Sequence, residues 1–380
     1  MSTPVFADSF GRTDIGCVRD SNQDSYVIGN LETGERLEAE QPVRIEVDGR
    51  GPLFVVCDGM GGAAGGDVAA RLAAEVVWAE MGASESTEER SVYARVLRRA
   101  VRLANRRVFQ ESLKNPRLRG MGTTLSAAGL VGDAVVLAQV GDSRAYIFRN
   151  RTLTQVTRDQ SIVSALLHAG RITEEEARVS ARANMILQAL GVHEDVQVAL
   201  SIVEVRQGDT LLLCSDGLHG PVGHDQLEAA FTACPDLDEA VKTLIALARS
   251  AGGPDNITAV AARFDGEGLR QPLGDEDLPR FVEFDPMEEG PAALTTTSWV
   301  ARRLAAQAGI GEDPGPPAVP ATGQHEVFRG NLPEVTPELS DVPGPASRRL
   351  AEGERLGLVA WGIALGIAVA LLLLLLWDYL

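Results

Sequence analysis

The chain has 380 residues, 35 of them Lys or Arg and 53 Asp or Glu, and its formal net charge is −18 at pH 7. This balance would repel a polyanion, so nucleic acid is excluded as the main partner. With 45% apolar and 23% charged residues the composition is globular, which excludes global disorder. Its four cysteines show no C-x-x-C spacing and its N-terminus no secretory pattern, so we expect a reducing, cytosolic compartment for the main domain.

Strand and helix patterns alternate over residues 1–264, which we expect to form one globular domain. Short Leu-rich or β-branched runs, each bounded by Gly, Asp or Asn, predict strands at Leu53–Cys57, Ala134–Val140, Leu200–Val205, Thr210–Cys214 and Ile257–Phe264. Apolar residues at helical spacing predict amphipathic helices over Val92–Val108 and Leu237–Ala248. The arginines on the polar face of the first helix are interpreted as a solvated surface.

The composition changes after residue 264. Residues 265–355 are rich in proline and acid and hold few apolar residues, so they cannot bury enough surface to offset the entropy of ordering, and we expect a disordered linker. Residues 356–377 then form 22 positions without a charge, which at about 1.5 Å per residue span a bilayer core. Because Arg348, Arg349 and Arg355 precede this run, the positive-inside rule predicts a single-pass anchor in the inner (cytoplasmic) membrane, with the main domain in the cytoplasm.

Aspartates recur where the apolar runs meet Gly, Ser or Asn. They are Asp24, Asp58, Asp142, Asp216 and Asp255. Each alone is most simply a turn former or helix cap. If the strands are neighbours, however, their ends converge, and the carboxylates would repel one another or take up protons unless a cation joins them. The donors are hard oxygens, and no Cys or His cluster has zinc spacing, so the pattern predicts Mg²⁺ or Mn²⁺.

A pair of such ions indicates a reaction class. Two ions about 3.5–4 Å apart can orient a hydroxide for in-line attack on phosphorus, which predicts phosphoester hydrolysis by direct water attack. No G-x-S-x-G, H-E-x-x-H or G-x-x-x-x-G-K-[ST] motif supports a competing mechanism. A phosphatase also needs a cation to grip the phosphate oxygens. Arg19 is the candidate, an ordinary surface arginine being the alternative.

Ordered blocks along residues 6–264 resemble the type 2C metal-dependent protein serine/threonine phosphatases, in the form common in bacteria. The blocks are GCVRDSNQD (16–24), VCDGMGG (56–62), GMGTTLSAA (120–128), QVGDSRAY (139–146), LTQVTRDQS (153–161), LLLCSDGL (211–218) and GGPDNITAV (252–260). The resemblance implies an α+β fold, a four-layer α-β-β-α sandwich of two antiparallel sheets flanked by helices. The metals would lie in a cleft at one end of the sandwich.

The resemblance also implies a ligand set for two catalytic Mn²⁺ or Mg²⁺ ions. Asp58 would bridge them, and Gly59 would offer its carbonyl oxygen to one. Asp216 and Asp255 would ligate the other. The segment 163–190 resembles the family's mobile flap beside the cleft.

Further roles follow from the same resemblance. Arg19 would clamp the phosphate, and Asp24 stands where the family has acidic residues around metal-bound waters. Asp142 is similar to a ligand of a more weakly held third metal. Met60 stands where many eukaryotic members have a histidine that protonates the leaving oxygen, so the general acid is unassigned. His219 is a candidate for it, although a histidine at the cleft edge without that role is the simpler interpretation.

These features predict a membrane-anchored phosphatase that acts on phosphoserine and phosphothreonine in phosphorylated proteins. A Ser/Thr protein kinase would be its natural opponent. The alternative is a non-catalytic, phosphatase-like module that binds phosphoprotein or metal and regulates through its linker. Asp58, Asp216 and Asp255 are all present, which favours the enzyme.

Overall fold

The computed structural model describes most of the first 285 residues. The described positions are 3–37, 41–47, 50–61, 65–85, 89–173, 176, 185–283 and 285. They belong to the first of the two units into which the chain divides, residues 1–317 and 318–380. The predicted membrane helix at 356–377 and most of the predicted linker lie outside the described residues. Among the described residues, no helix is long and apolar enough to cross a membrane.

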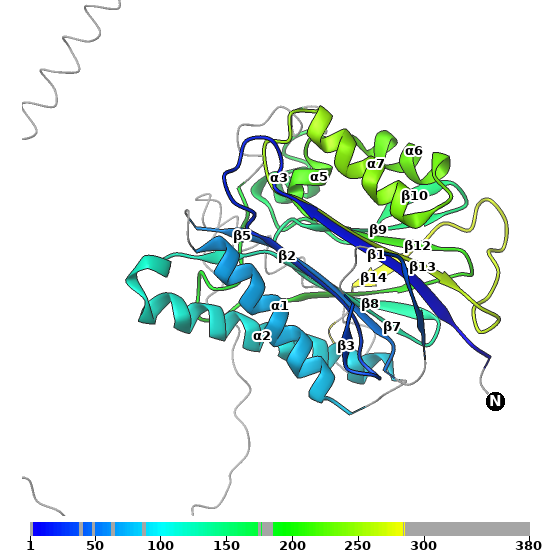
Figure 1. Ribbon diagram of the computed structural model, residues 1–380, viewed down its shortest axis with the longest axis horizontal. Coiled ribbons are helices and arrows are strands. Elements are labelled where there is room, and N and C mark those ends of the chain that lie inside the picture. Colours follow the sequence, from blue (N-terminus) through cyan, green and yellow to red (C-terminus); the bar gives the residue numbers. More distant parts are fainter. Residues whose placement is uncertain are drawn as a thin grey trace, which may run out of the picture. The chain divides into compact units, whose positions relative to one another are not determined.

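Two antiparallel sheets form the centre of the fold (Figure 1). One has the order β14 (Phe281–Glu283), β11 (Ala199–Glu204), β8 (Ala134–Val140), β7 (Leu125–Val131), β5 (Pro52–Met60), β2 (Asp24–Asn30) and β3 (Glu35–Arg36), with β6 (Gly122–Thr123) paired to β5. The other has the order β10 (Thr152–Gln155), β9 (Arg144–Arg149), β12 (Thr210–Cys214), β13 (Ile257–Asp265), β1 (Phe6–Asp14) and β4 (Val43–Glu46). The five strands predicted from apolar runs are confirmed as β5, β8, β11, β12 and β13.

Helices cover the outer face of each sheet (Figure 1). On the sheet that contains β5 lie α1 (Gly66–Ala83) and α2 (Arg90–Lys114), and on the other lie α5 (Asp216–His219), α6 (His224–Ala233) and α7 (Leu237–Ser250). Two short helices, η1 (Pro116–Leu118) and α3 (Ile162–His168), lie in connections. The expected four-layer order of helices, sheet, sheet and helices is therefore confirmed.

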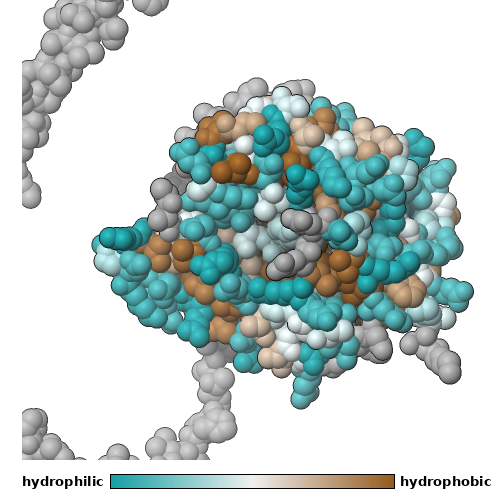
Figure 2. Space-filling view, viewed as in Figure 1, coloured by the Kyte–Doolittle hydropathy of each residue, from teal (hydrophilic) through white to brown (hydrophobic). Residues whose placement is uncertain are grey.

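The central strands β5, β7, β8 and β12 bury both of their faces. In β5, Leu53, Val55 and Cys57 pack with α1 and α2, whereas Phe54 and Val56 pack against the second sheet. A strand buried on both faces has a nearly continuous apolar sequence, which explains why such runs identified the strands. Hydrophilic side chains predominate on the face shown in Figure 2, where apolar ones form separate patches.

The ordered chain continues beyond residue 264, where we expected the linker to begin. Strand β14 pairs with β11 at the edge of its sheet. In the segment that precedes β14, Asp277 accepts hydrogen bonds from Arg149 and Arg206, each at 3.3 Å. Both arginines are buried, so a carboxylate from the acidic segment satisfies charges that would otherwise be costly. Composition alone cannot reveal such partners, because they come from the folded sandwich.

Candidate active site

Sheet topology brings the aspartates to one end of the sandwich. Strands β5 and β8 are both antiparallel to β7 and so run in the same direction, which places Asp58 and Asp142 at the same end. In β2, which is antiparallel to β5, Asp24 lies directly opposite Asp58. In the second sheet β12 ends where β13 begins, next to Asp216 and Asp255. The predicted convergence of strand ends is confirmed.

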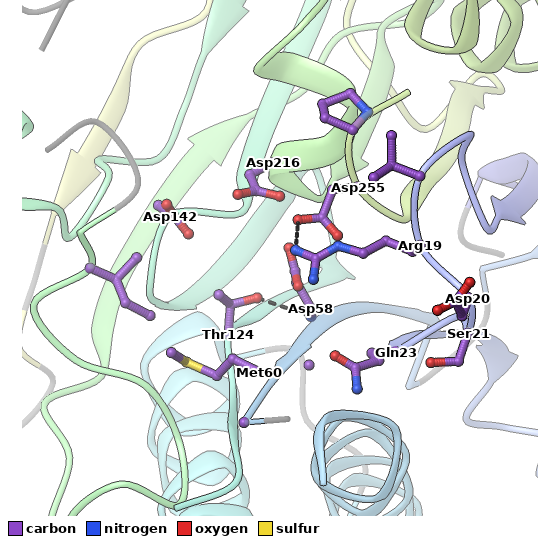
Figure 3. Close-up of a pocket in the computed structure, with 15 residues that line it drawn as sticks. Arg19, Asp20, Ser21, Gln23, Asp58, Met60, Thr124, Asp142, Asp216 and Asp255 are labelled. Carbon is purple, nitrogen blue, oxygen red and sulfur yellow. Dashed lines mark hydrogen bonds and ion pairs between the residues drawn. The ribbon is translucent and has the colours of Figure 1, made fainter. Parts of the chain in front are cut away.

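A cleft of about 670 Å³ opens at this end (Figure 3). Four of the five predicted aspartates line the cleft together with Arg19 and Gly59. The exception is Asp24, which is not among the lining residues. Asp24 lies below the surface, where its Oδ2 accepts hydrogen bonds from Ser215 Oγ at 2.8 Å and Thr258 Oγ1 at 2.6 Å. Both donors belong to the second sheet or its edge, so Asp24 joins the two sheets beneath the cleft.

The backbone of Asp58 is held by two threonines. Its N–H donates to Thr124 Oγ1 at 3.0 Å, and its carbonyl oxygen accepts from the N–H of Thr124 and from Thr123 Oγ1, both at 2.9 Å. These bonds fix the end of β5 and aim the Asp58 carboxyl group into the cleft (Figure 3). Both threonines occur in the block GMGTTLSAA, but sequence reasoning assigned them no role.

The carboxyl groups destabilise one another's charged forms. The pKa of Asp58 is raised well above its ordinary value by burial and then by the charges of Asp24 and Asp216. Burial also raises the pKa of Asp216. Burial raises the pKa of Asp24 to about 7, although Thr258 and Ser215 oppose this shift. Burial, followed by the charge of Asp216, raises the pKa of Asp142 to about 7. Without a cation the cluster therefore retains protons near neutral pH.

Arg19 supplies the positive charge in this structure. Its Nη2 lies 2.7 Å from Asp255 Oδ2, and about half of the arginine side chain is exposed. The guanidinium lies beside Asp255 and Asp58 in Figure 3. Among the described residues, no three acidic, His or Cys side chains are gathered closely enough around one point to hold an ion.

The residues nevertheless fit a hard divalent cation. Asp24 Oδ1 and Asp216 Oδ1 are buried and have no hydrogen-bond partner. A buried carboxylate oxygen without a partner is costly, and a cation would satisfy it. All the side-chain donors are carboxylate oxygens, which Mg²⁺ and Mn²⁺ prefer.

Gly59 is required by the close approach of the backbone around it. A Cβ atom at this position would lie 2.2 Å from the carbonyl oxygen of Gly66 and 2.5 Å from that of Gln23. No side chain fits there. The glycine therefore allows the start of α1 and the loop before β2 to meet at the cleft.

Asn256 is a positioning residue that sequence reasoning missed. Its Oδ1 accepts from the N–H of Gln23 at 2.8 Å, and its Nδ2 donates to the carbonyl oxygens of Ile15 and Ser21, both at 3.0 Å. It thereby fastens the loop that carries Arg19 to the start of β13. The available signal was its place directly after Asp255 in the block GGPDNITAV.

The two positions considered for proton transfer differ in location. Met60 lines the cleft, whereas His219 does not. The Nε2 atom of His219 lies 3.1 Å from the carbonyl oxygen of Asp142. Burial and then the charge of Arg144 lower the pKa of His219 to about 3. A neutral histidine held in this way is a poor general acid, which agrees with the simpler interpretation of this residue.

Comparisons with known proteins show the family. The family described as protein phosphatase 2C matches residues 42–257. The chain is 37% identical over 252 residues to the serine/threonine phosphatase stp of Listeria welshimeri, covering 66% of this chain and 92% of the relative. It is 38% identical over 251 residues to the serine/threonine protein phosphatase PstP of Mycobacterium tuberculosis, covering 66% of this chain and 44% of the relative.

A solved structure shows the same fold. It is the catalytic domain of serine threonine protein phosphatase PstP in complex with two manganese ions, with a TM-score of 0.57, 34% identity and coverage of 69% of this chain and 99% of that one. A two-sheet sandwich with convergent carboxylates thus defines a metal-dependent phosphatase. The chain belongs to the protein phosphatase 2C family and is a protein serine/threonine phosphatase.

Proposed function

We propose that this chain uses two Mn²⁺ or Mg²⁺ ions to hydrolyse phosphoserine and phosphothreonine in proteins. The convergence of the carboxylates on one cleft, with buried oxygens left unsatisfied, carries this proposal. Asp58, the carbonyl of Gly59, Asp216 and Asp255 would hold the ions, and Asp142 a weaker third. When bound, the ions supply positive charge that polarises the phosphoryl group and lowers the pKa of the attacking water.

Arg19 binds the phosphate in this proposal. It is half exposed at the cleft and needs only to exchange Asp255 for the non-bridging phosphate oxygens, which match the guanidinium geometry. Held there, the phosphorus faces the carboxylate cluster. Attack by water forms a new P–O bond as the bond to the Ser or Thr oxygen breaks. The proton that the water loses is balanced by one taken up by the departing oxygen, so the products are the free hydroxyl group and inorganic phosphate.

Asp24 supports the cluster from below. Two hydroxyl groups hold its Oδ2, so its unpartnered Oδ1 is kept in a fixed orientation. We assign it the role of a hydrogen-bond acceptor for water beside the ions. The Asn256 bonds to the Arg19 loop keep the clamp and the carboxylates in register.

Hydrolysis of p-nitrophenyl phosphate and of a phosphothreonine peptide by the full chain tests the proposal. Turnover is expected with Mn²⁺ or Mg²⁺, none with EDTA, and a loss of at least 100-fold in Asp216→Ala. Absence of turnover in a folded, metal-bound chain would instead favour the regulatory module that binds phosphoprotein without cleaving it.

We also propose that residues 356–377 anchor the enzyme in the cytoplasmic membrane and that a Ser/Thr protein kinase opposes it. The uncharged 22-residue run and the arginines before it support the anchor. Anchoring both enzymes would raise their effective concentration. Deletion of residues 356–380 should move the protein from the membrane fraction to the soluble fraction. Retention in membranes would contradict the anchor.

A further inference from the structure

Apolar side chains are exposed along one wall of the active cleft. Met60 and Ile186 line the cleft, and Val192 stands beside Met60. Met60 and Val192 are 37% and 41% exposed. We call these three residues the apolar wall. Single exposed apolar residues are ordinary on a protein surface, but Met60 and Ile186 share the cleft that holds the carboxylates, and Val192 lies near Met60 although it is not among the residues that line the cleft.

The wall is built by short pairings that hold its three parts together. Gly59 and Met60 of β5 pair with β6, and Thr123 of β6 exchanges backbone hydrogen bonds with Leu190 at 3.1 and 2.8 Å. Gly122 leaves room between the side chains, since a Cβ atom there would lie 3.0 Å from Val192 Cγ2 and 3.5 Å from Met60 Cγ. Val192 therefore extends the wall outward from Met60.

The backbone around Ile186 is held by the loop before α3. It forms an isolated bridge with Ser161, and the N–H of Leu187 donates to the carbonyl oxygen of Gln160 at 2.7 Å. The Gln160 side chain in turn accepts from the N–H of Gly141 at 2.8 Å. Main-chain bonds thus position Ile186 relative to the Asp142 loop.

The wall faces the phosphate clamp. In Figure 3 Met60 and Arg19 lie on opposite sides of Asp58. Asp142, which also lines the cleft, is only 7% exposed. A polypeptide whose phosphate is gripped by Arg19 and the carboxylate cluster has its neighbouring residues about 4 Å along the chain. Their side chains would be within reach of Met60 and Ile186, the apolar side chains on this side of the described lining.

We propose that the apolar wall of Met60, Ile186 and Val192 is a substrate subsite that binds a nonpolar side chain next to the phosphorylated Ser or Thr. This inference rests on the proposed function, because it assumes that the phosphate occupies the carboxylate cluster. Burial of the substrate side chain removes apolar area from water on both partners, while a charged side chain would lose hydration there without gaining a partner.

The test uses the full chain with Mn²⁺ and phosphothreonine peptides that differ only in the residue before or after the phosphothreonine. Leu, Ala, Lys and Glu are compared at each place. We expect the best Leu peptide to exceed its Ala counterpart about 5- to 10-fold in kcat/KM, mainly through a lower KM, and Lys and Glu to give no gain over Ala. Equal kcat/KM for all four would overturn the subsite.

Two variants connect this preference to the wall. Val192→Thr keeps the shape of the side chain but adds a hydroxyl, and Ile186→Thr shortens and polarises the other side. Each should reduce the Leu-to-Ala ratio at least threefold. Leu273→Gln is the matched control, because Leu273 is exposed but does not line the cleft, and it should leave the ratio unchanged.

The outcomes separate the subsite from the proposed function. Failure of the wild-type chain to hydrolyse p-nitrophenyl phosphate with Mn²⁺ would refute the proposed function itself. Turnover of that compound together with a Leu preference that survives in both threonine variants would show that the apolar contact lies elsewhere, and it would refute the wall alone.

Discussion

At the scale of single residues, burial decides the chemistry of the carboxyl groups. The pKa of Asp142 rises to about 7 because burial excludes water and the charge of Asp216 lies nearby. Burial likewise raises the pKa of Asp24 to about 7. A raised folded-state pKa means that the native protein holds these protons more tightly than the unfolded chain does, so stability depends on pH.

The metal-free chain should therefore be more stable at pH 5.5 than at pH 8. The contribution of a raised carboxyl pKa is fully present below about pH 4 and is lost as pH rises through about 7. About half of this contribution remains at pH 5.5, so the expected difference between the two pH values is about 2 kcal/mol per group. Urea unfolding of EDTA-treated protein at both pH values measures it.

Asp142→Asn is the control for this pH dependence, since the amide cannot titrate and part of the difference should disappear. Addition of Mn²⁺ at pH 8 should restore stability by binding the ionised carboxylates. A metal-free chain that is equally stable or more stable at pH 8 would contradict the assignment.

Arg19 competes with a cation for Asp255. Removal of its charge in Arg19→Gln should free the carboxylate, which is 2.7 Å from the guanidinium, and tighten Mn²⁺ binding a few-fold in calorimetric titrations. The same variant should raise KM for a phosphothreonine peptide at least 10-fold, because the bidentate phosphate contact is lost. Arg12→Gln, at an exposed arginine outside the cleft lining, provides a control of equal charge. Weaker Mn²⁺ binding in Arg19→Gln would show that the ion pair does not compete.

At the scale of elements, the packing of α2 on its sheet depends on a glycine. A Cβ atom at Gly129 of β7 would lie 1.8 Å from the hydroxyl oxygen of Tyr93, which is buried and has no hydrogen-bond partner. Gly129→Ala should therefore lower the free energy of unfolding by about 1–3 kcal/mol, because the helix must shift or the ring must rotate.

Tyr93→Phe supplies the matched test of this contact. It removes the unpartnered hydroxyl and should leave stability unchanged or slightly higher. Combined with Gly129→Ala, it should recover part of the loss, which a double-mutant cycle in urea measures. Strict additivity of the two changes would show that the hydroxyl is not the obstacle.

The segment between β2 and β5 shows what local patterns cannot determine. Residues 31–50 resemble a charged hairpin insertion, yet β3 pairs with β2 and β4 pairs with β1, at edges of different sheets. Strand β3 consists of two charged residues, and the four residues of β4 alternate between apolar and charged. The local sequence alone favours pairing the two strands with each other as a hairpin. Their actual partners are set by the arrangement of the two sheets.

At the scale of the whole molecule, the sandwich includes part of the acidic segment that follows β13. Arg149 is 3% exposed at its side chain and contacts both Asp209 and Asp277. A chain that ends at residue 264 loses Asp277 and β14, which leaves buried arginine charge less satisfied and exposes the edge of β11.

A chain truncated after residue 285 should therefore be about 2–3 kcal/mol more stable than one truncated after residue 264. Thermal or urea unfolding of the two proteins measures the difference. Asp277→Ala in the longer chain should reproduce much of the loss, whereas Glu276→Ala, at the neighbouring acid, should not. Equal stability of the two truncated proteins would mean that the contacts after 264 add nothing.

Sequence alone determined two kinds of element: strands that are buried on both faces and helices whose apolar residues follow a local spacing. The apolar runs identified β5, β8, β11, β12 and β13 because both faces of these strands face a core, and helical spacing identified α2 and α7. The ordered motif blocks identified the family, and the placement of aspartates at strand ends predicted their convergence.

Only the tertiary structure decided how those residues meet. The depth of Asp24, the ion pair of Arg19 with Asp255 and the role of Asn256 depend on contacts between residues more than 200 positions apart. The extension of the sandwich past residue 264 likewise depends on Arg149 and Arg206, which lie 128 and 71 positions before Asp277. Such contacts have no local pattern, because sheet topology and burial create them, and they set the charge state of the site.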